Sequence, residues 1–87
     1  MTAKYHTVFT DQAKRQLRVI DRDFALAILH KLTQLSDDPY GYGTTELVGA
    51  NGRRRLRVGD YRVIYTVHND QLLVEVVKVG HRSRVYD

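Results

Sequence analysis

Apolar residues in the first half of the chain recur at the spacing of a helix. Two series repeat at intervals of three and four residues: Ala13, Leu17 and Ile20, then Phe24, Ile28, Leu32 and Leu35. Thr10 or Asp11 can cap the first helix and Asp21 the second, because their side-chain oxygens accept hydrogen bonds from the free amides of a first turn. Pro39 disfavours the α conformation in the residue before it. The pattern predicts a helical hairpin that ends near residue 35.

The remaining segments favour β-strands. Residues 4–9 form a short strand pattern, and four more runs follow at 45–48, 53–58, 61–67 and 71–79. Gly59-Asp60 is a two-residue hairpin signal, and Gly80 is expected to break the last strand. That strand is apolar on both faces, so we expect it to be central in the sheet. The chain is predicted to have an α+β fold: a short N-terminal strand, a helical hairpin, then an antiparallel β-meander, with the helices on one face of the sheet.

The composition excludes several classes of function. An 87-residue chain is expected to form one domain, residues 1–87, without a separate cofactor domain. The absence of Cys excludes disulfides, thiolate metal sites and Cys nucleophiles, and the four His show no metal-ligand spacing. No apolar run approaches the ~18 residues of a transmembrane helix, and the N-terminus is not a signal peptide. We expect a soluble intracellular protein that uses no metal or cofactor and has no membrane partner.

The charge is uneven along the chain. Fourteen Lys and Arg against ten Asp and Glu leave a formal net charge of +4. Residues 1–52 hold six basic and six acidic side chains, whereas residues 53–87 hold eight basic and four acidic ones. Seven of those eight bases are Arg, whose planar guanidinium matches phosphate oxygens in bidentate geometry. The bias favours nucleic acid as a partner, and a basic face that only aids solubility is the alternative.

Strand alternation gathers much of this charge on one face of the sheet. In 53–58 it separates Arg53, Arg55 and Arg57 from Arg54, Leu56 and Val58. The apolar members of the second set turn that face toward the helices. Alternation in the next strand places Arg62 beside the three-arginine face. Like charges directly opposite each other destabilise a sheet, so four Arg without interleaved carboxylates indicate a site for phosphate groups.

The C-terminal segment adds titratable and aromatic side chains. His81, Arg82 and Tyr86 follow Gly80 within six residues, at the end of a strand beside the arginines. His81 can act as a general acid or base, and Tyr86 can transfer a proton or stack on a nucleobase. A lone terminal His is more often solvated and a terminal Tyr more often packs on a helix. Their combination with the arginines is what indicates phosphate chemistry.

Two segments resemble the RelE toxins of the RelE/ParE superfamily, the toxin halves of bacterial toxin–antitoxin pairs. They are Arg-Leu-Arg-Val-Gly-Asp-Tyr-Arg-Val-Ile-Tyr at 55–65 and Val-Val-Lys-Val-Gly-His-Arg-Ser-Arg-Val-Tyr at 76–86. The resemblance extends over the whole chain, including the opening strand, the helical hairpin and the Asp-Pro loop. It implies a ribosome-dependent endoribonuclease of the bacterial cytoplasm that cuts the mRNA codon in the A site. In that family the ribose 2′-hydroxyl attacks the adjacent phosphorus without a metal, leaving a 2′,3′-cyclic phosphate and a 5′-hydroxyl.

The resemblance also implies roles by position. The catalytic set falls on Arg55, Arg62, His81, Arg82 and Tyr86. Arg62 matches the family's phosphate-orienting arginine, and Tyr86 matches its proposed base or stacking partner. Four further arginines are expected to bind RNA phosphates: Arg53, Arg54, Arg57 and Arg84. For Arg54, Arg57 and Arg84 the expected contact is ribosomal RNA, with plain solvation as the alternative. Well-understood members carry Lys where this chain has Arg53 and Arg55, and Arg transfers a proton poorly. Proton transfer therefore shifts toward His81 and Tyr86.

The resemblance implies partners as well, and two alternatives remain. A cognate antitoxin would keep the toxin from entering the ribosome. The two proteins would form a higher-order complex that binds DNA through the antitoxin. One alternative is a ParE-like inhibitor of DNA gyrase without nuclease activity, although such chains lack the terminal His81-Arg82 and Tyr86 set. The other is a non-catalytic RNA-binding module with the same basic face.

Overall fold

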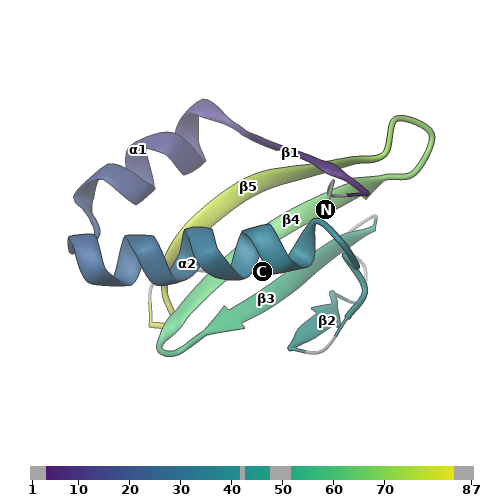
Figure 1. Cartoon of the computed structure of the whole chain (residues 1–87). Coiled ribbons are helices and arrows are strands. Elements are labelled where there is room, and N and C mark those ends of the chain that lie inside the picture. Colours follow the sequence, from purple (N-terminus) through teal and green to yellow (C-terminus); the bar gives the residue numbers. More distant parts are fainter. Residues whose placement is uncertain (1–3, 42, 48–51, 84–87) are drawn as a thin grey trace.

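The computed structural model describes residues 4–41, 43–47 and 52–83, which form two helices and five strands (Figure 1). In chain order these are β1 (His6–Phe9), α1 (Asp11–Val19), α2 (Arg22–Leu35), β2 (Thr44–Glu46), β3 (Arg53–Val58), β4 (Tyr61–His68) and β5 (Leu73–His81). The predicted α+β class and helical hairpin are confirmed. Strand bounds differ from prediction by a few residues.

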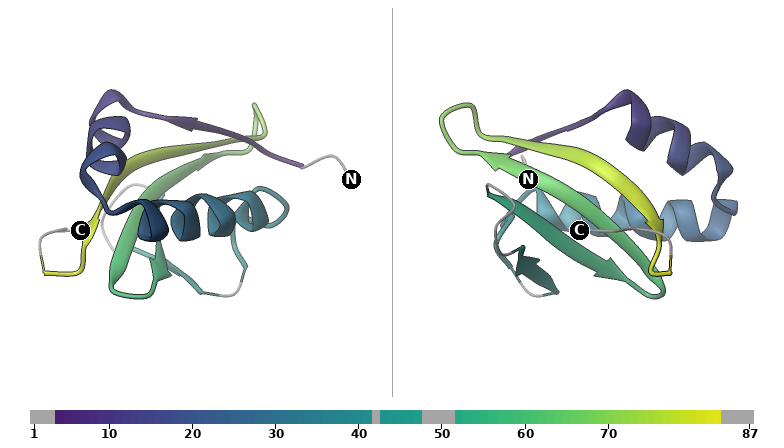
Figure 2. Two further views of the ribbon diagram at one scale, coloured as in Figure 1. Left: turned by 60° about the vertical axis from the view of Figure 1, so that its left-hand side comes forward. Right: turned by 180° about the vertical axis from the view of Figure 1, so that it is seen from behind.

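The strands form one mixed sheet in the order β1-β5-β4-β3-β2. Strands β2 to β5 pair antiparallel, as the predicted meander requires, whereas β1 pairs parallel with β5. Parallel strands need a long crossover, and here the chain between β1 and β5 includes the helical hairpin. Both helices cover one face, and the view from behind shows the other face without a helix over it (Figure 2). The strand predicted to be central, β5, is interior, but β4 occupies the middle position.

The core lies between the helices and the sheet. Its fully buried members come from both layers and include Ala13, Ile28, Val63, Tyr65, Val74 and Val76. The hydroxyl of Tyr65 donates to the Pro39 carbonyl at 2.5 Å, so the largest core side chain keeps a hydrogen bond. Burial raises the pKa of Tyr65 because the phenolate loses its hydration, and hydrogen bonding to Arg54 and Thr44 opposes that shift.

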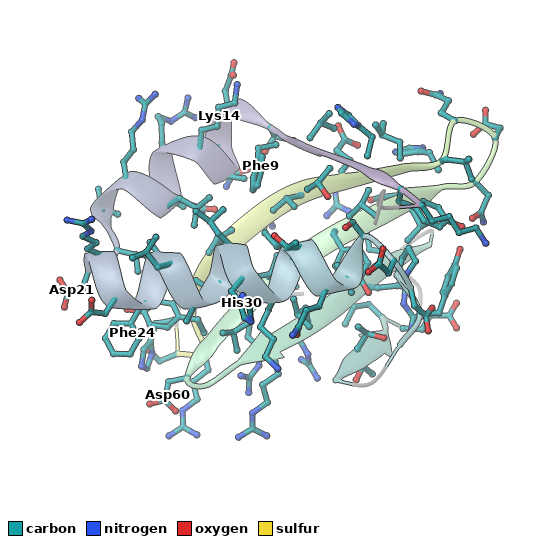
Figure 3. All side chains as sticks on the ribbon, in the orientation of Figure 1. Phe9, Lys14, Asp21, Phe24, His30 and Asp60 are labelled. Carbon is teal, nitrogen blue, oxygen red and sulfur yellow. The ribbon has the colours of Figure 1, made fainter. Side chains whose placement is uncertain are left out.

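The two helices begin differently. Thr10 caps α1, since its hydroxyl oxygen accepts from the Ala13 N–H at 3.1 Å. Asp21 occupies the cap position of α2 without a side-chain cap hydrogen bond. Phe24, predicted to be buried, is 51% exposed. Its ring lies against that of Tyr61, the first residue of β4, with the centroids 5.3 Å apart. Figure 3 shows Phe24 near the N-terminal end of α2.

Strand β5 contains a β-bulge that the sequence pattern does not reveal. Tyr65 pairs with Val76 and Ile64 with Lys78, which leaves Val77 as the extra residue. As a result Val74 and Val76 face the core on one side of the bulge and Val79 on the other. The prediction that Gly80 breaks this strand is wrong, because Gly80 pairs with Arg62 and the strand continues to His81.

Candidate nucleic-acid interface

The predicted arginine face is present on the side of the sheet away from the helices. Arg57 lies directly opposite Arg62 across β3 and β4, and Arg55 and Arg53 follow along β3 opposite Ile64 and Thr66. Paired residues of adjacent strands point to the same face, so these arginines form one surface. Alternation along two strands was sufficient to predict it.

The arginines line a shallow hollow of about 380 Å³, which we call the arginine hollow. It is lined by Gly43, Thr44, Thr45, Arg55, Arg57 and Arg62. Strand β2 supplies one wall, because Thr45 pairs with Arg55, and the Arg57 N–H donates to the Gly43 carbonyl at 3.2 Å. Guanidinium and hydroxyl donors thus converge on one concave polar surface, which suits an oxyanion such as phosphate.

Desolvation and neighbouring cations act against the charge of Arg62. Its pKa is lowered, first by desolvation and then by the charges of Arg57, Arg55 and Arg82, while Asp60 raises it. The Asp60 carboxylate reaches Arg82 rather weakly, at 3.8 Å from its Nε, and both side chains are well exposed. The Arg82 N–H also donates to the Asp60 carbonyl at 2.7 Å, which holds Arg82 beside this end of the sheet. A bound anion would relieve the mutual repulsion of these cations.

Arg54 lies on the opposite face of β3 and outside the hollow. Its guanidinium donates to the Thr44 hydroxyl at 2.9 Å and stacks over the Tyr40 ring at 5.0 Å. The Thr44 hydroxyl in turn donates to the Gly41 carbonyl at 2.7 Å. Arg54 therefore fastens the 40–44 loop, which borders the hollow, to the sheet. These contacts support a positioning role for Arg54.

His81 does not share a face with Arg62. It pairs with Tyr61 and therefore points to the helix side of the sheet, edge-on to the Tyr61 ring at 5.6 Å between centroids. The residues predicted to form one site therefore lie on two faces of the sheet. Arg55, Arg57 and Arg62 share the face away from the helices, with Arg82 near them, whereas His81 at the end of β5 points to the helix side. Arg84 and Tyr86 lie outside the described residues.

Sequence reasoning missed the hollow's second wall. Gly43, Thr44 and Thr45 read as the end of a loop and the start of a short strand, and only the register of β2 against β3 brings them to the arginines. The identity of residue 43 as Gly was a local signal in the sequence, because its backbone adopts a φ of +87°, which favours Gly.

The hollow's lining determines what it can do chemically. Its Arg, Thr and Gly residues can orient a phosphate and stabilise added negative charge, but guanidinium and hydroxyl groups are poor at transferring protons. Proton transfer would need a group from outside the lining. Among the residues that the structure describes, no group of three His, Cys, Asp or Glu could hold a metal ion. No helix in the same ranges is long and apolar enough to cross a membrane.

Comparison with known proteins defines the class. The sequence model described as "ParE toxin of type II toxin-antitoxin system, parDE" matches residues 7–86. The toxin RelE of Mycobacterium tuberculosis is 29% identical over 83 residues, covering 94% of this chain and 86% of that protein.

Solved structures show the same fold. The RelBE2 toxin–antitoxin complex of Mycobacterium tuberculosis contains a chain with a TM-score of 0.82 and 26% identity, covering 91% of this chain and 99% of that one. The isolated RelE toxin of Escherichia coli has a TM-score of 0.79 at 22% identity, covering 88% of this chain and 83% of that one. The fold and sequence together define a toxin of a type II toxin–antitoxin system. The chain belongs to the ParE toxin family, and the similar relatives and solved structures are RelE toxins and their complexes.

Proposed function

We propose that this toxin is a ribosome-dependent endoribonuclease that cleaves mRNA codons in the A site and thereby inhibits translation. The arginine hollow is the observation that carries the proposal. Arg57 faces Arg62 directly, and neighbouring cations together with desolvation lower the pKa of Arg62. Such an arrangement disfavours the folded protein alone and favours a complex with a phosphate.

In the proposed reaction the ribose 2′-hydroxyl attacks the adjacent phosphorus. The 2′-oxygen loses its proton and bonds to phosphorus, while the bond to the 5′-oxygen breaks and that oxygen gains a proton. A 2′,3′-cyclic phosphate and a 5′-hydroxyl result. Arg62, Arg55 and Arg82 would stabilise the charge of the pentavalent phosphorane, in place of metal cations. Arg53, Arg57 and Arg84 would bind flanking phosphates of mRNA or ribosomal RNA.

Two groups are proposed for proton transfer. His81 stands at the end of β5, one residue before Arg82, and Tyr86 follows four residues after Arg82. Imidazole suits a general acid or base near neutral pH, whereas guanidinium does not. Because His81 faces the helix side, an RNA bound in the arginine hollow would have to pass the end of β5 to reach it.

The proposed partners are the ribosome, mRNA and a cognate antitoxin in the cytoplasm of a bacterium. The similar RelBE2 structure is a toxin–antitoxin complex, which supports an antitoxin for this chain. In this proposal the bound antitoxin prevents RNA from reaching the arginine hollow. Toxin and antitoxin form a higher-order assembly that binds DNA through the antitoxin.

Primer extension on mRNA from a bacterial translation extract tests the nuclease. The wild-type chain should cut within translated codons, and the cuts should vanish when ribosomes are omitted. Arg62→Gln should reduce cleavage about 100-fold or more, the range seen when one oxyanion donor is removed. Arg18→Gln, which removes an equal charge from an exposed position of α1, should cleave normally. Intact mRNA in the wild-type reaction would overturn the proposal.

Inhibition of DNA gyrase is the second candidate, because the matching family is described as ParE toxin of parDE. A supercoiling assay with purified gyrase separates the two, since only the ParE-like function predicts inhibition with intact mRNA. An RNA-binding module without turnover would instead bind mRNA and leave it uncut. In that case His81→Ala and Tyr86→Phe would change little, whereas Arg substitutions would weaken binding.

A further inference from the structure

A second hollow, of about 550 Å³, lies on the helix side of the sheet at the end of β5. Its lining comes from α1 and its C-cap, from β4, and from β5 and the turn that follows it: Gln16, Val19, Ile20, Tyr61, Val79, Gly80, His81 and Ser83. Strand β1 pairs only with the segment of β5 from Leu73 to Val76, so α1 flanks the strand beyond that point (Figure 1). We call this concavity the β5-edge hollow.

The hydrogen bonds around this hollow leave two donors for a ligand. The Gln16 Oε1 accepts from the Val79 N–H at 2.7 Å, so the amide oxygen is occupied and the amide NH₂ remains to donate. The Ser83 N–H donates to Nδ1 of His81 at 3.3 Å, and the Ser83 hydroxyl lies 2.9 Å from the same atom. A backbone N–H can only donate, so Nδ1 is the acceptor and the ring proton is on Nε2.

The walls suit a flat aromatic ligand. Tyr61 and His81 lie edge to face, and Phe24 extends this aromatic row with its centroid 5.3 Å from that of Tyr61. Val19, Ile20 and Val79 supply an apolar lining. An apolar, aromatic-walled hollow with a few convergent polar groups is the usual form of a small-ligand site, and nucleobases stack on such rings.

The position beside the arginines indicates what the ligand is attached to. Gly80 pairs with Arg62, so the strand carries no side chain between that guanidinium and the end of β5. Arg82 comes next and contributes to the positive charge felt by Arg62. A nucleotide with its phosphate near Arg62 and Arg82 would meet no β5 side chain at Gly80 between those cations and the β5-edge hollow.

We propose that the β5-edge hollow binds a nucleobase of the RNA substrate and that its two donors select guanine. Guanine presents two adjacent acceptors, N7 and O6, on one edge, whereas adenine presents an acceptor beside a donor there and cytosine a donor. The Gln16 amide and the His81 Nε2–H would donate to guanine, and Tyr61 would contact its ring. With both ring nitrogens of His81 engaged in this way, proton transfer in the proposed reaction falls to Tyr86. Ser83 acts as a positioning residue that holds His81 in the donating tautomer. The inference rests on the proposed function in that the ligand is RNA.

Titration with single nucleotides, followed by amide chemical shifts, tests the base preference. GMP should bind more tightly than AMP, CMP or UMP and should shift the amides of Gln16, Tyr61 and Val79–Ser83. Gln16→Glu keeps an oxygen for the Val79 N–H and removes the NH₂ donor, so it should weaken GMP binding about tenfold and abolish the preference. Gln12→Glu makes the same change at an exposed position of α1 and should retain both. Ser83→Ala should reduce the preference for GMP over AMP without losing binding.

Three outcomes would overturn the inference: equal affinity for all four nucleotides, the same shifts with inorganic phosphate alone, or shifts at this hollow only with a co-expressed antitoxin. The last would make it a protein-docking surface. The mRNA cleavage assay gives an independent result. Cleavage of mRNA without a preference for GMP would contradict only the proposed base site. A preference for GMP without cleavage would contradict only the proposed nuclease activity.

Discussion

At the scale of single residues, the site is built from an interaction that works against folding. Arg57 and Arg62 face each other across two strands, and such like-charge pairs cost roughly 0.2–1 kcal/mol. Arg54, one residue from Arg55, illustrates the opposite case, since it is held by Thr44 and Tyr40 on the other face. Neighbouring arginines with equal charge thus have different roles because the pleat directs them to different surroundings.

Tyr65 should make the fold sensitive to high pH. Burial raises its pKa, so the folded state holds the phenol proton more tightly than the unfolded state does. This contribution to stability is fully present below the ordinary phenol pKa of about 10 and is lost as pH rises through the higher folded-state value. The urea-unfolding free energy should therefore fall as pH increases above about 10.

Tyr65→Phe isolates this contribution. It removes the hydrogen bond to the Pro39 carbonyl and should cost about 1 kcal/mol at neutral pH. Its unfolding free energy should then decline less steeply than that of the wild-type chain above pH ~10. An equally steep decline in both proteins would show that another group controls the alkaline transition.

At the scale of elements, regular periodicity predicted most of the fold. The helical hairpin, the β3–β4 hairpin and the arginine face all follow from uninterrupted periods of 3.6 or 2. Alternation failed to predict the faces of β5, because the extra residue Val77 changes which side chains face the core. Register is a property of two paired strands, so neither the bulge nor the side to which His81 points can be derived from β5 alone.

Helix α1 should depend on its cap more than α2 does. The Thr10 oxygen accepts from the Ala13 N–H at 3.1 Å, and its hydroxyl donates to the carbonyl of the bulge residue Val77 at 3.0 Å. Thr10→Ala should lower the unfolding free energy by about 1–2 kcal/mol. Asp21→Ala is the matched control, since the Asp21 side chain makes no cap hydrogen bond, and it should cost only a few tenths. Equal losses in urea unfolding would contradict this assignment.

At the scale of the whole molecule, the charge distribution and the sheet combine to form the site. Composition alone indicated that residues 53–87 carry the entire net charge of +4, and alternation placed much of it on one face. The wall supplied by Gly43, Thr44 and Thr45 came only with the pairing of β2 to β3. The facing arginines could be predicted from the second half of the sequence. The shape of the arginine hollow could not, because one of its walls comes from a segment in the middle of the chain.

This distribution predicts how the whole chain responds to salt. Because Arg55, Arg57 and Arg82 each repel Arg62, screening by NaCl should raise the unfolding free energy of the free toxin. Phosphate should stabilise it at lower concentration than chloride does, since an anion bound only to the folded state adds to stability by mass action. Arg62→Gln should fold as stably as the wild type or up to about 1 kcal/mol more so, with a weaker phosphate response.

Thermal unfolding in matched ionic strengths of NaCl and sodium phosphate measures both effects. Arg18→Gln removes one charge from the exposed surface of α1 and should keep the full phosphate response. Destabilisation of Arg62→Gln by more than 1 kcal/mol, with the phosphate response unchanged, would mean that Arg62 supports the fold. The expected result is that removing the Arg62 charge leaves stability unchanged or raises it while the phosphate response weakens. It would indicate that the fold tolerates repulsion at Arg62 in order to bind an anion.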